Sequence, residues 1–146
     1  MASEAAASLE ILIVDDEPGD VELTRLALAE GRFTCNVTVA GDGEKAMAFL
    51  RKQPPYAAKL KPDLVLLDLN MPRKNGREVL FEMKADPMLS LIPVVVLTTS
   101  DAERDVVASY RLGAAGYVTK PADIDTLFQM IRGIEEYWFG TVRRPA

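Results

Sequence analysis

The sequence predicts an α/β fold in which five parallel strands alternate with five helices. Short apolar runs rich in β-branched residues alternate with amphipathic stretches along the chain. Most of these runs are apolar throughout, as strands are when both faces of a parallel sheet are covered. The predicted strands cover residues 9–14, 36–40, 63–68, 93–98 and 114–119, and the predicted helices cover 18–30, 43–52, 75–85, 102–112 and 122–138. We therefore predict a doubly wound, five-stranded (βα)5 sheet.

Three local signals support the helix assignments. Pro18 suits the first turn of a helix, where the N–H that proline lacks would have no partner. Asp101 or Ser100 is expected to cap the fourth helix. The fifth helix carries an apolar stripe that we expect to pack on the sheet, formed by Ile124, Leu127, Phe128, Ile131, Ile134 and Trp138.

Length and composition indicate one domain. The chain has 146 residues, of which 49% are apolar, enough for a hydrophobic core without disulfides. We place the domain at residues 9–138, between a flexible N-terminal tail, 1–8, and a C-terminal tail, 139–146.

Composition also limits location and partners. Cys35 is the single cysteine, and the first residues lack the basic start and long apolar stretch of a secretion signal, so we expect a cytoplasmic protein. The longest apolar stretch, 91–97, falls far short of the roughly 20 residues that span a bilayer. A net charge of −5 argues against nucleic-acid binding. Because the chain has no histidine, its chemistry must use carboxylates, hydroxyls and lysine.

Chemically informative residues follow four of the predicted strands. They are Asp15, Asp16 and Glu17 after the first strand, Asp68 at the end of the third, Thr98 at the end of the fourth and Lys120 after the fifth. The carboxyl ends of parallel strands meet at one edge of the sheet, where ligands bind in this architecture. We therefore expect these side chains to form one site.

The expected site suits a divalent cation and a nucleophilic aspartate. Asp15, Asp16 and Asp68 would repel one another unless a cation lay among them, and Mg²⁺ prefers such oxygen ligands, with Mn²⁺ as a substitute. A carboxylate attacks a phosphoryl group only where the charge of that group is screened, and Lys120 is the candidate for this role beside the metal. Pro121 follows the lysine directly, which favours a cis peptide bond and a rigid mount.

Four motifs together resemble the receiver domain of bacterial two-component systems. They are DD at 15–16, DLNMP at 68–72, LTTSD at 97–101 and GYVTKP at 116–121, and the match covers roughly residues 9–138. The resemblance implies a flavodoxin-like sheet with strand order 2-1-3-4-5. It also implies that Asp68 is the phosphoacceptor, that Mg²⁺ is held by Asp15, Asp16, Asp68 and the Asn70 carbonyl, and that Lys120 pairs with the phosphoryl group.

The resemblance further implies how such a protein signals. A histidine kinase supplies the phosphoryl group, and the receiver assists its own phosphorylation and dephosphorylation without being classed as an enzyme. Thr98 and Tyr117 correspond to the switch pair that remodels the face formed by the fourth helix, the fifth strand and the fifth helix. Because the tail GTVRRPA carries no output domain, we expect the downstream target to be another protein.

A narrower resemblance is to small single-domain regulators paired with phytochrome-type histidine kinases. It rests on the loop at 53–62, on REVL at 77–80 and on EEYWFGTV at 135–142. Such regulators often dimerise through the switch face, which makes Tyr137, Trp138 and Phe139 candidates for a dimer or partner surface. Two departures from the common receiver pattern, Ala122 and Thr99, bear on phosphoryl lifetime and partner docking.

Simpler roles exist for the same residues. The acidic pair at 15–16 would also suit a helix N-cap, Asp68 a turn, and Lys120 a solvated position. Thr98 and Tyr117 are natural packing residues in strands, and the aromatic residues at 137–139 also suit a partly buried helix end.

Other functions fit the sequence less well. Haloacid-dehalogenase phosphatases also use an aspartate and Mg²⁺, but they need a second carboxylate at the position of Asn70. No glycine-rich nucleotide-binding loop follows any predicted strand. The remaining alternative is a phosphorylation-independent docking scaffold, although the complete set of Asp15, Asp16, Asp68, Thr98 and Lys120 argues against it.

Overall fold

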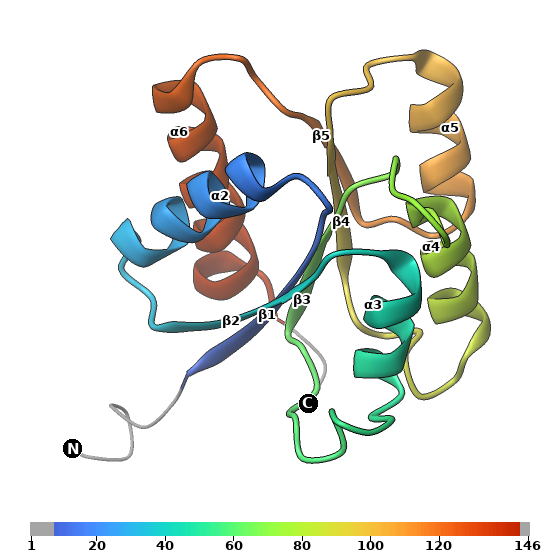
Figure 1. Ribbon diagram of the computed structural model, residues 1–146. Helices are drawn as coiled ribbons and strands as arrows, with labels where there is room; N and C mark the ends of the chain where they lie inside the picture. The colour runs from blue at the N-terminus through green and yellow to red at the C-terminus, as the bar shows by residue number, and fades with distance from the viewer. Residues whose placement is uncertain (1–7, 144–146) are drawn as a thin grey trace.

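Five parallel strands form the centre of the structure, a computed structural model that describes residues 8–143 (Figure 1). The strands are β1 (Leu9–Val14), β2 (Cys35–Ala40), β3 (Leu64–Leu67), β4 (Val94–Thr98) and β5 (Gly116–Thr119). Their order is β2-β1-β3-β4-β5, with every neighbouring pair parallel. The predicted fold and strand order are therefore confirmed. The predicted flexible tail, 1–8, lies outside the described residues except for Ser8.

Helices cover both faces of this sheet. They are α2 (Pro18–Glu30), α3 (Gly43–Leu50), α4 (Gly76–Ala85), α5 (Glu103–Arg111) and α6 (Ile124–Glu135), and α6 continues into a π-helix, η1 (Glu136–Thr141). Figure 1 shows α2 and α6 on one side of the sheet and α3, α4 and α5 on the other. Within residues 8–143, no helix is both long and apolar enough to cross a membrane.

The apolar side chains of the strands belong to two separate cores, because alternate side chains of a strand point to opposite faces of the sheet. In β1, Leu12 and Val14 belong to the core under α3 and α4, whereas Ile11 and Ile13 belong to the core under α2 and α6. All four are at most 3% exposed. This two-sided burial explains why the strand sequences are apolar at successive positions rather than at every second one.

Two local predictions are wrong. Ala102, rather than Asp101 or Ser100, is the N-cap of α5, and it makes no side-chain capping bond. The Ser100 hydroxyl instead donates to the carboxylate of Asp105 and accepts from the Ala102 N–H at 3.4 Å. The predicted cis bond before Pro121 is also wrong, since the cis peptide within residues 8–143 is Pro54–Pro55. Pro18 does begin α2 as expected, after the N-cap Glu17.

The prediction of an apolar stripe on α6 is correct at the centre of the helix and wrong at its start. Leu127 and Ile131 are buried, but Ile124 is 53% exposed because it is the first residue of the helix and lies beyond the packed face. At the other end, Glu135 occupies the next stripe position, four residues after Ile131, and is only 1% exposed. A carboxylate at a core position was not foreseen from the sequence.

Glu135 is buried against the start of β2 and the end of α2. The Cys35 thiol donates to its carboxylate at 3.2 Å, and burial and this contact raise the pKa of the thiol to about 12. A Cβ on Gly31 would lie 1.7 Å from the carboxylate, so glycine makes room for it. Burial raises the pKa of Glu135 above its ordinary value, because the charged form loses hydration.

Glu135→Gln is expected to stabilise the protein at pH 7 by on the order of 1 kcal/mol, because it removes a buried charge and keeps an acceptor for Cys35. Folding raises the pKa of this carboxyl, so its ionisation at higher pH lowers the stability of the folded state. This loss of stability disappears as the pH falls towards the ordinary pKa of 4.5. The gain should therefore shrink in acid. Urea unfolding at pH 7 and pH 4.5 measures it.

Glu136→Gln provides the control. Its carboxylate is ion-paired with Arg32 at 2.7 Å on the surface, where such pairs contribute little to stability. A stability difference for Glu135→Gln that did not change between the two pH values would show that ionisation of Glu135 is not its cause.

Candidate functional site

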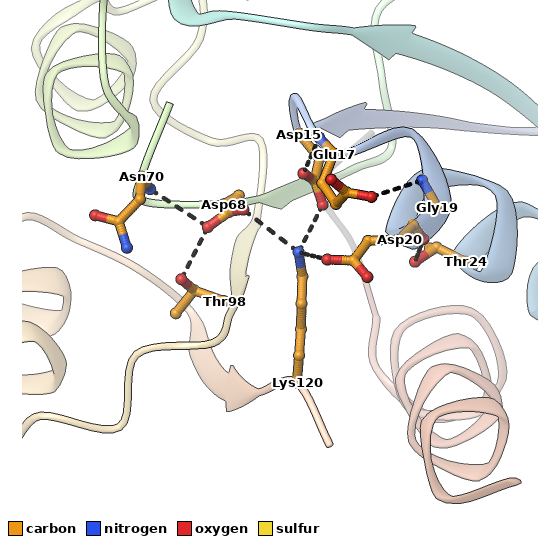
Figure 2. A network of polar contacts seen from close by, with 9 residues as sticks. All are labelled: Asp15, Glu17, Gly19, Asp20, Thr24, Asp68, Asn70, Thr98 and Lys120. Carbon is orange, nitrogen blue, oxygen red and sulfur yellow. Dashed lines mark hydrogen bonds and ion pairs between the residues drawn. The ribbon is translucent and has the colours of Figure 1, made fainter. Parts of the chain in front are cut away.

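The functional residues predicted from the sequence meet at the carboxyl edge of the sheet. Asp15 follows β1, Asp68 follows β3, Thr98 ends β4 and Lys120 follows β5 (Figure 2). Backbone hydrogen bonds extend the sheet through these positions, since the Asp68 N–H donates to Val14 O at 2.9 Å and the Lys120 N–H to Thr98 O at 2.7 Å. The strand ends therefore hold the side chains in one place.

Lys120 lies at the centre of this cluster. Its Nζ is 2.7 Å from Asp15 Oδ2, 2.9 Å from Asp20 Oδ2 and 3.3 Å from Asp68 Oδ2. The lysine side chain is only 7% exposed. Burial alone lowers the pKa of Lys120, but its hydrogen bonds to Asp15 and Asp20 raise it by more, so the amine is charged at neutral pH.

Three carboxylates at this edge are close enough to share one metal ion. Asp15, Asp16 and Asp68 each offer an oxygen that lies within 4.8 Å of the others. Asp15 is buried and Asp16 is exposed, so the cluster opens to solvent on one side. A set of carboxylate oxygens suits a hard divalent cation such as Mg²⁺. Burial raises the pKa of Asp15, although the hydrogen bond from Lys120 opposes the shift.

Asp68 also receives hydrogen bonds on its second oxygen. The Thr98 hydroxyl donates to Oδ1 at 2.8 Å, and the Asn70 N–H reaches the same atom at 3.3 Å. Thr98 is completely buried, so its hydroxyl position is fixed by packing as well as by this bond. The carboxylate of Asp68 is thus held between a hydroxyl on one oxygen and an ammonium on the other.

Tyr117 lies further from the carboxylates. Its hydroxyl donates to the backbone carbonyl of Ser100 at 2.8 Å, and its ring packs against the core under α3 and α4. Burial raises the pKa of the phenol. The ring therefore connects β5 to the loop that follows Thr98, two residues beyond the hydroxyl that contacts Asp68.

Close packing fixes the loop between Asp68 and α4. A Cβ on Gly76 would lie 2.2 Å from the Asp68 carbonyl oxygen, and one on Gly43 would lie 2.1 Å from the Lys74 carbonyl oxygen. Asp42 is 1% exposed, and its carboxylate forms an ion pair at 3.0 Å with the guanidinium of Arg73, which lies in the same loop. Only glycine permits these two approaches, because any Cβ would collide with backbone atoms.

Asp20 was not foreseen as part of the site. It lies in the first turn of α2, five residues after Asp15 in the sequence, and its carboxylate contacts Lys120 (Figure 2). The signal was present in the sequence, since the helix start at Pro18 places the first turn beside the end of β1. Acidic residues are common in the first turn of a helix because they interact favourably with the helix dipole. The sequence alone therefore does not distinguish Asp20 from such a residue.

The three aromatic residues of η1 do not share one surface. Tyr137 is 54% exposed, whereas Trp138 and Phe139 pack partly against the core under α2 and α6. The ring of Phe139 meets that of Phe33 edge-on, with centroids 5.9 Å apart. Of the three candidates for a dimer or partner surface, Tyr137 is thus the most exposed, and Trp138 and Phe139 are half-buried.

The chain that carries this site matches a known protein family. Residues 11–132 match the response regulator receiver domain family. The chain is a response-regulator receiver domain. The predicted family and the predicted strand order are both confirmed.

The receiver domain is similar over its whole length to known relatives. It is 45% identical over 146 residues to response regulator Rcp1 of Synechocystis, covering 100% of this chain and 99% of that protein. It superposes on the crystal structure of the phosphorylated cyanobacterial phytochrome response regulator RcpA with a TM-score of 0.92, at 47% identity and covering 96% and 100% of the two chains. The Mn²⁺-bound form of Rcp1 gives a TM-score of 0.89 at 46% identity, covering 94% and 99%.

Proposed function

We propose that this receiver domain accepts a phosphoryl group on Asp68 from a histidine kinase, in a reaction that requires Mg²⁺. The observation that carries the proposal is the environment of Asp68. One of its carboxylate oxygens accepts from Thr98, the other contacts the Lys120 ammonium, and two further aspartates lie beside it. A buried lysine and a threonine on one carboxylate suit the binding of an added phosphoryl group better than they suit a turn or a helix cap.

The proposed transfer forms one bond and breaks another. A carboxylate oxygen of Asp68 attacks the phosphorus of a phosphohistidine, the new O–P bond forms, and the N–P bond to the imidazole breaks in line with it. Lys120 and the Thr98 hydroxyl then contact phosphoryl oxygens in place of the carboxylate oxygens that they contact here. Hydrolysis of the aspartyl phosphate at the same site resets the domain.

The carboxylates of Asp15, Asp16 and Asp68 and the carbonyl of Asn70 are the proposed metal ligands. Bound there, Mg²⁺ or Mn²⁺ would offset the negative charge of the carboxylates and of the incoming phosphoryl group. The spacing of the carboxylate oxygens and the Mn²⁺-bound form of the related Rcp1 support this assignment.

Metal binding is expected to stabilise the folded domain. At a Mg²⁺ concentration 100 times its Kd, the gain in unfolding free energy should be about 2.7 kcal/mol. Asp16→Asn should remove most of it, whereas Asp101→Asn, at an exposed carboxylate outside the cluster, should not. Thermal unfolding in MgCl₂ and in EDTA at equal ionic strength measures the difference. Equal gains for the two variants would exclude Asp16 as a ligand.

The proposed switch couples Asp68 to the face formed by α5, β5 and α6. When the Thr98 hydroxyl moves to contact the new phosphoryl oxygens, the backbone on either side of Thr98 shifts. Because Tyr117 donates a hydrogen bond to the Ser100 carbonyl, this shift also moves Tyr117. A partner that prefers one arrangement of this face would read the phosphorylation state, typically with a coupling of about 1–3 kcal/mol.

We also propose that the kinase is of the phytochrome type, as for the related RcpA. The test is transfer from a phosphorylated cyanobacterial phytochrome histidine kinase, followed by loss of label from the kinase and its gain by this chain. Transfer within seconds, compared with minutes for an unrelated histidine kinase, would support the pairing. Equal rates from both kinases would contradict it.

The same face is the proposed dimer surface. Tyr110 and Tyr137, 50% and 54% exposed, flank a shallow groove over β5 and α6 that Tyr117, Ile134 and Trp138 also line. Exposed aromatic residues around an apolar groove are typical of protein contacts. Light scattering with and without beryllofluoride, a phosphoryl analogue, tests the proposal, and a monomer under both conditions would exclude it.

A further inference from the structure

One carboxylate of the site has no part in the proposed metal set. Asp20 lies outside the group formed by Asp15, Asp16 and Asp68, yet its Oδ2 is 2.9 Å from Lys120 Nζ. That distance is shorter than the 3.3 Å from Nζ to Asp68 Oδ2. In Figure 2, Asp20 and Asp68 approach the ammonium from opposite sides. The lysine is therefore shared between α2 and the phosphoacceptor.

Helix capping does not explain this position of Asp20. The N-cap of α2 is Glu17, whose carboxylate already accepts from the Gly19 N–H at 2.9 Å. The carboxylate of Asp20 is instead directed at Lys120, and the residue stays in place through its own carbonyl, which accepts from the Thr24 hydroxyl at 2.9 Å. Thr24 is buried, so this first turn of α2 is anchored in the core.

We propose that Asp20 is a positioning residue that holds the Lys120 ammonium back from Asp68 until a phosphoryl group draws it across. This inference rests on the proposed function of Asp68. To contact phosphoryl oxygens beyond Asp68, the ammonium must move away from Asp20, because the two carboxylates lie on opposite sides of it. A metal ion would offset the charge of Asp15, but the carboxylate of Asp20 lies outside the metal set and keeps its hold on the lysine.

The consequence is a site that is less receptive to phosphoryl groups than one without this carboxylate. Asp20 is 35% exposed, so water weakens its attraction for the lysine without cancelling it. Asp20→Asn keeps the shape of the side chain and removes the charge. The variant is therefore expected to bind a phosphoryl analogue more tightly, by about three- to tenfold.

The experiment is a titration with beryllofluoride at saturating Mg²⁺, followed by fluorine NMR of the bound analogue. Asp20→Asn should lower the apparent Kd three- to tenfold relative to wild type. Glu22→Gln is the matched control, because it removes the same charge from an exposed position on α2, and its Kd should be unchanged. An unchanged or weaker affinity of Asp20→Asn would overturn the inference.

A second background separates action through the lysine from a general charge effect. In Lys120→Ala protein, which lacks the ammonium, Asp20→Asn should change the Kd by less than about 1.5-fold. The same tightening in both backgrounds would show that Asp20 merely repels the anion, and would overturn the positioning role. Wild-type protein that bound no analogue at all would instead refute the proposed function, so the two failures are distinguishable.

Discussion

Asp68→Asn is expected to abolish phosphoryl incorporation, with a loss of at least roughly 100-fold in rate, because an amide oxygen is not a nucleophile for phosphorus. The fold should persist. The amide still offers an oxygen to the Thr98 hydroxyl and to the Asn70 N–H, which contact Asp68 Oδ1 at 2.8 and 3.3 Å. The phosphorylated fraction after incubation with acetyl phosphate and Mg²⁺, read by mass spectrometry, measures the effect.

Asp125→Asn is the matched control for that substitution. Asp125 is an exposed carboxylate in the first turn of α6, and its loss should leave incorporation at the wild-type level. Appreciable incorporation by the Asp68→Asn variant would place the phosphoacceptor elsewhere and overturn the assignment.

Gly76→Ala is expected to destabilise the domain by about 3 kcal/mol and to slow phosphorylation at least tenfold. The new Cβ would lie 2.2 Å from the Asp68 carbonyl oxygen and 2.7 Å from Leu69 Cα. Both neighbours are backbone, so no side-chain rotation relieves the contact. The Gly76 N–H donates to Leu69 O at 2.9 Å, which ties the start of α4 to the same segment. Relief therefore requires movement of the backbone that carries Asp68.

Gly133→Ala shows what alanine does where no such contact exists. Gly133 lies in α6 with no atom within 4 Å of an added Cβ, so alanine should stabilise the helix by about 0.5–1 kcal/mol. Urea unfolding of both variants gives the comparison. A Gly76→Ala domain within about 0.5 kcal/mol of wild type would show that the loop adjusts freely and that its packing does not hold Asp68.

The fold and the main site residues could be predicted because they depend on local patterns. Apolar strands ending in Asp15, Asp68, Thr98 and Lys120 must place these residues together once the strands are parallel, whatever the details of packing. The strand order itself came from resemblance to the receiver family, since the periodicity of a strand does not reveal its neighbours.

Other features depend on three-dimensional contacts that leave little trace in the sequence. Asp20 resembles any acidic residue of a first helical turn, and its role appears only when β5 brings Lys120 beside α2. From the sequence alone, Glu135 resembles an ordinary solvated charge. In the structure, the missing side chain of Gly31 leaves space for its carboxylate in the core. The N-cap of α5 was predicted wrongly for the same reason, because the hydroxyl of Ser100 donates to the carboxylate of Asp105 instead of capping the helix.

Phosphorylation of this receiver domain is tested most directly by the intact mass of the wild-type protein after incubation with acetyl phosphate, with Mg²⁺ in one sample and EDTA in the other. The protein should gain about 80 Da with Mg²⁺ and nothing with EDTA. No gain in either sample would contradict the proposed phosphorylation and would favour a receiver fold that docks partners without it.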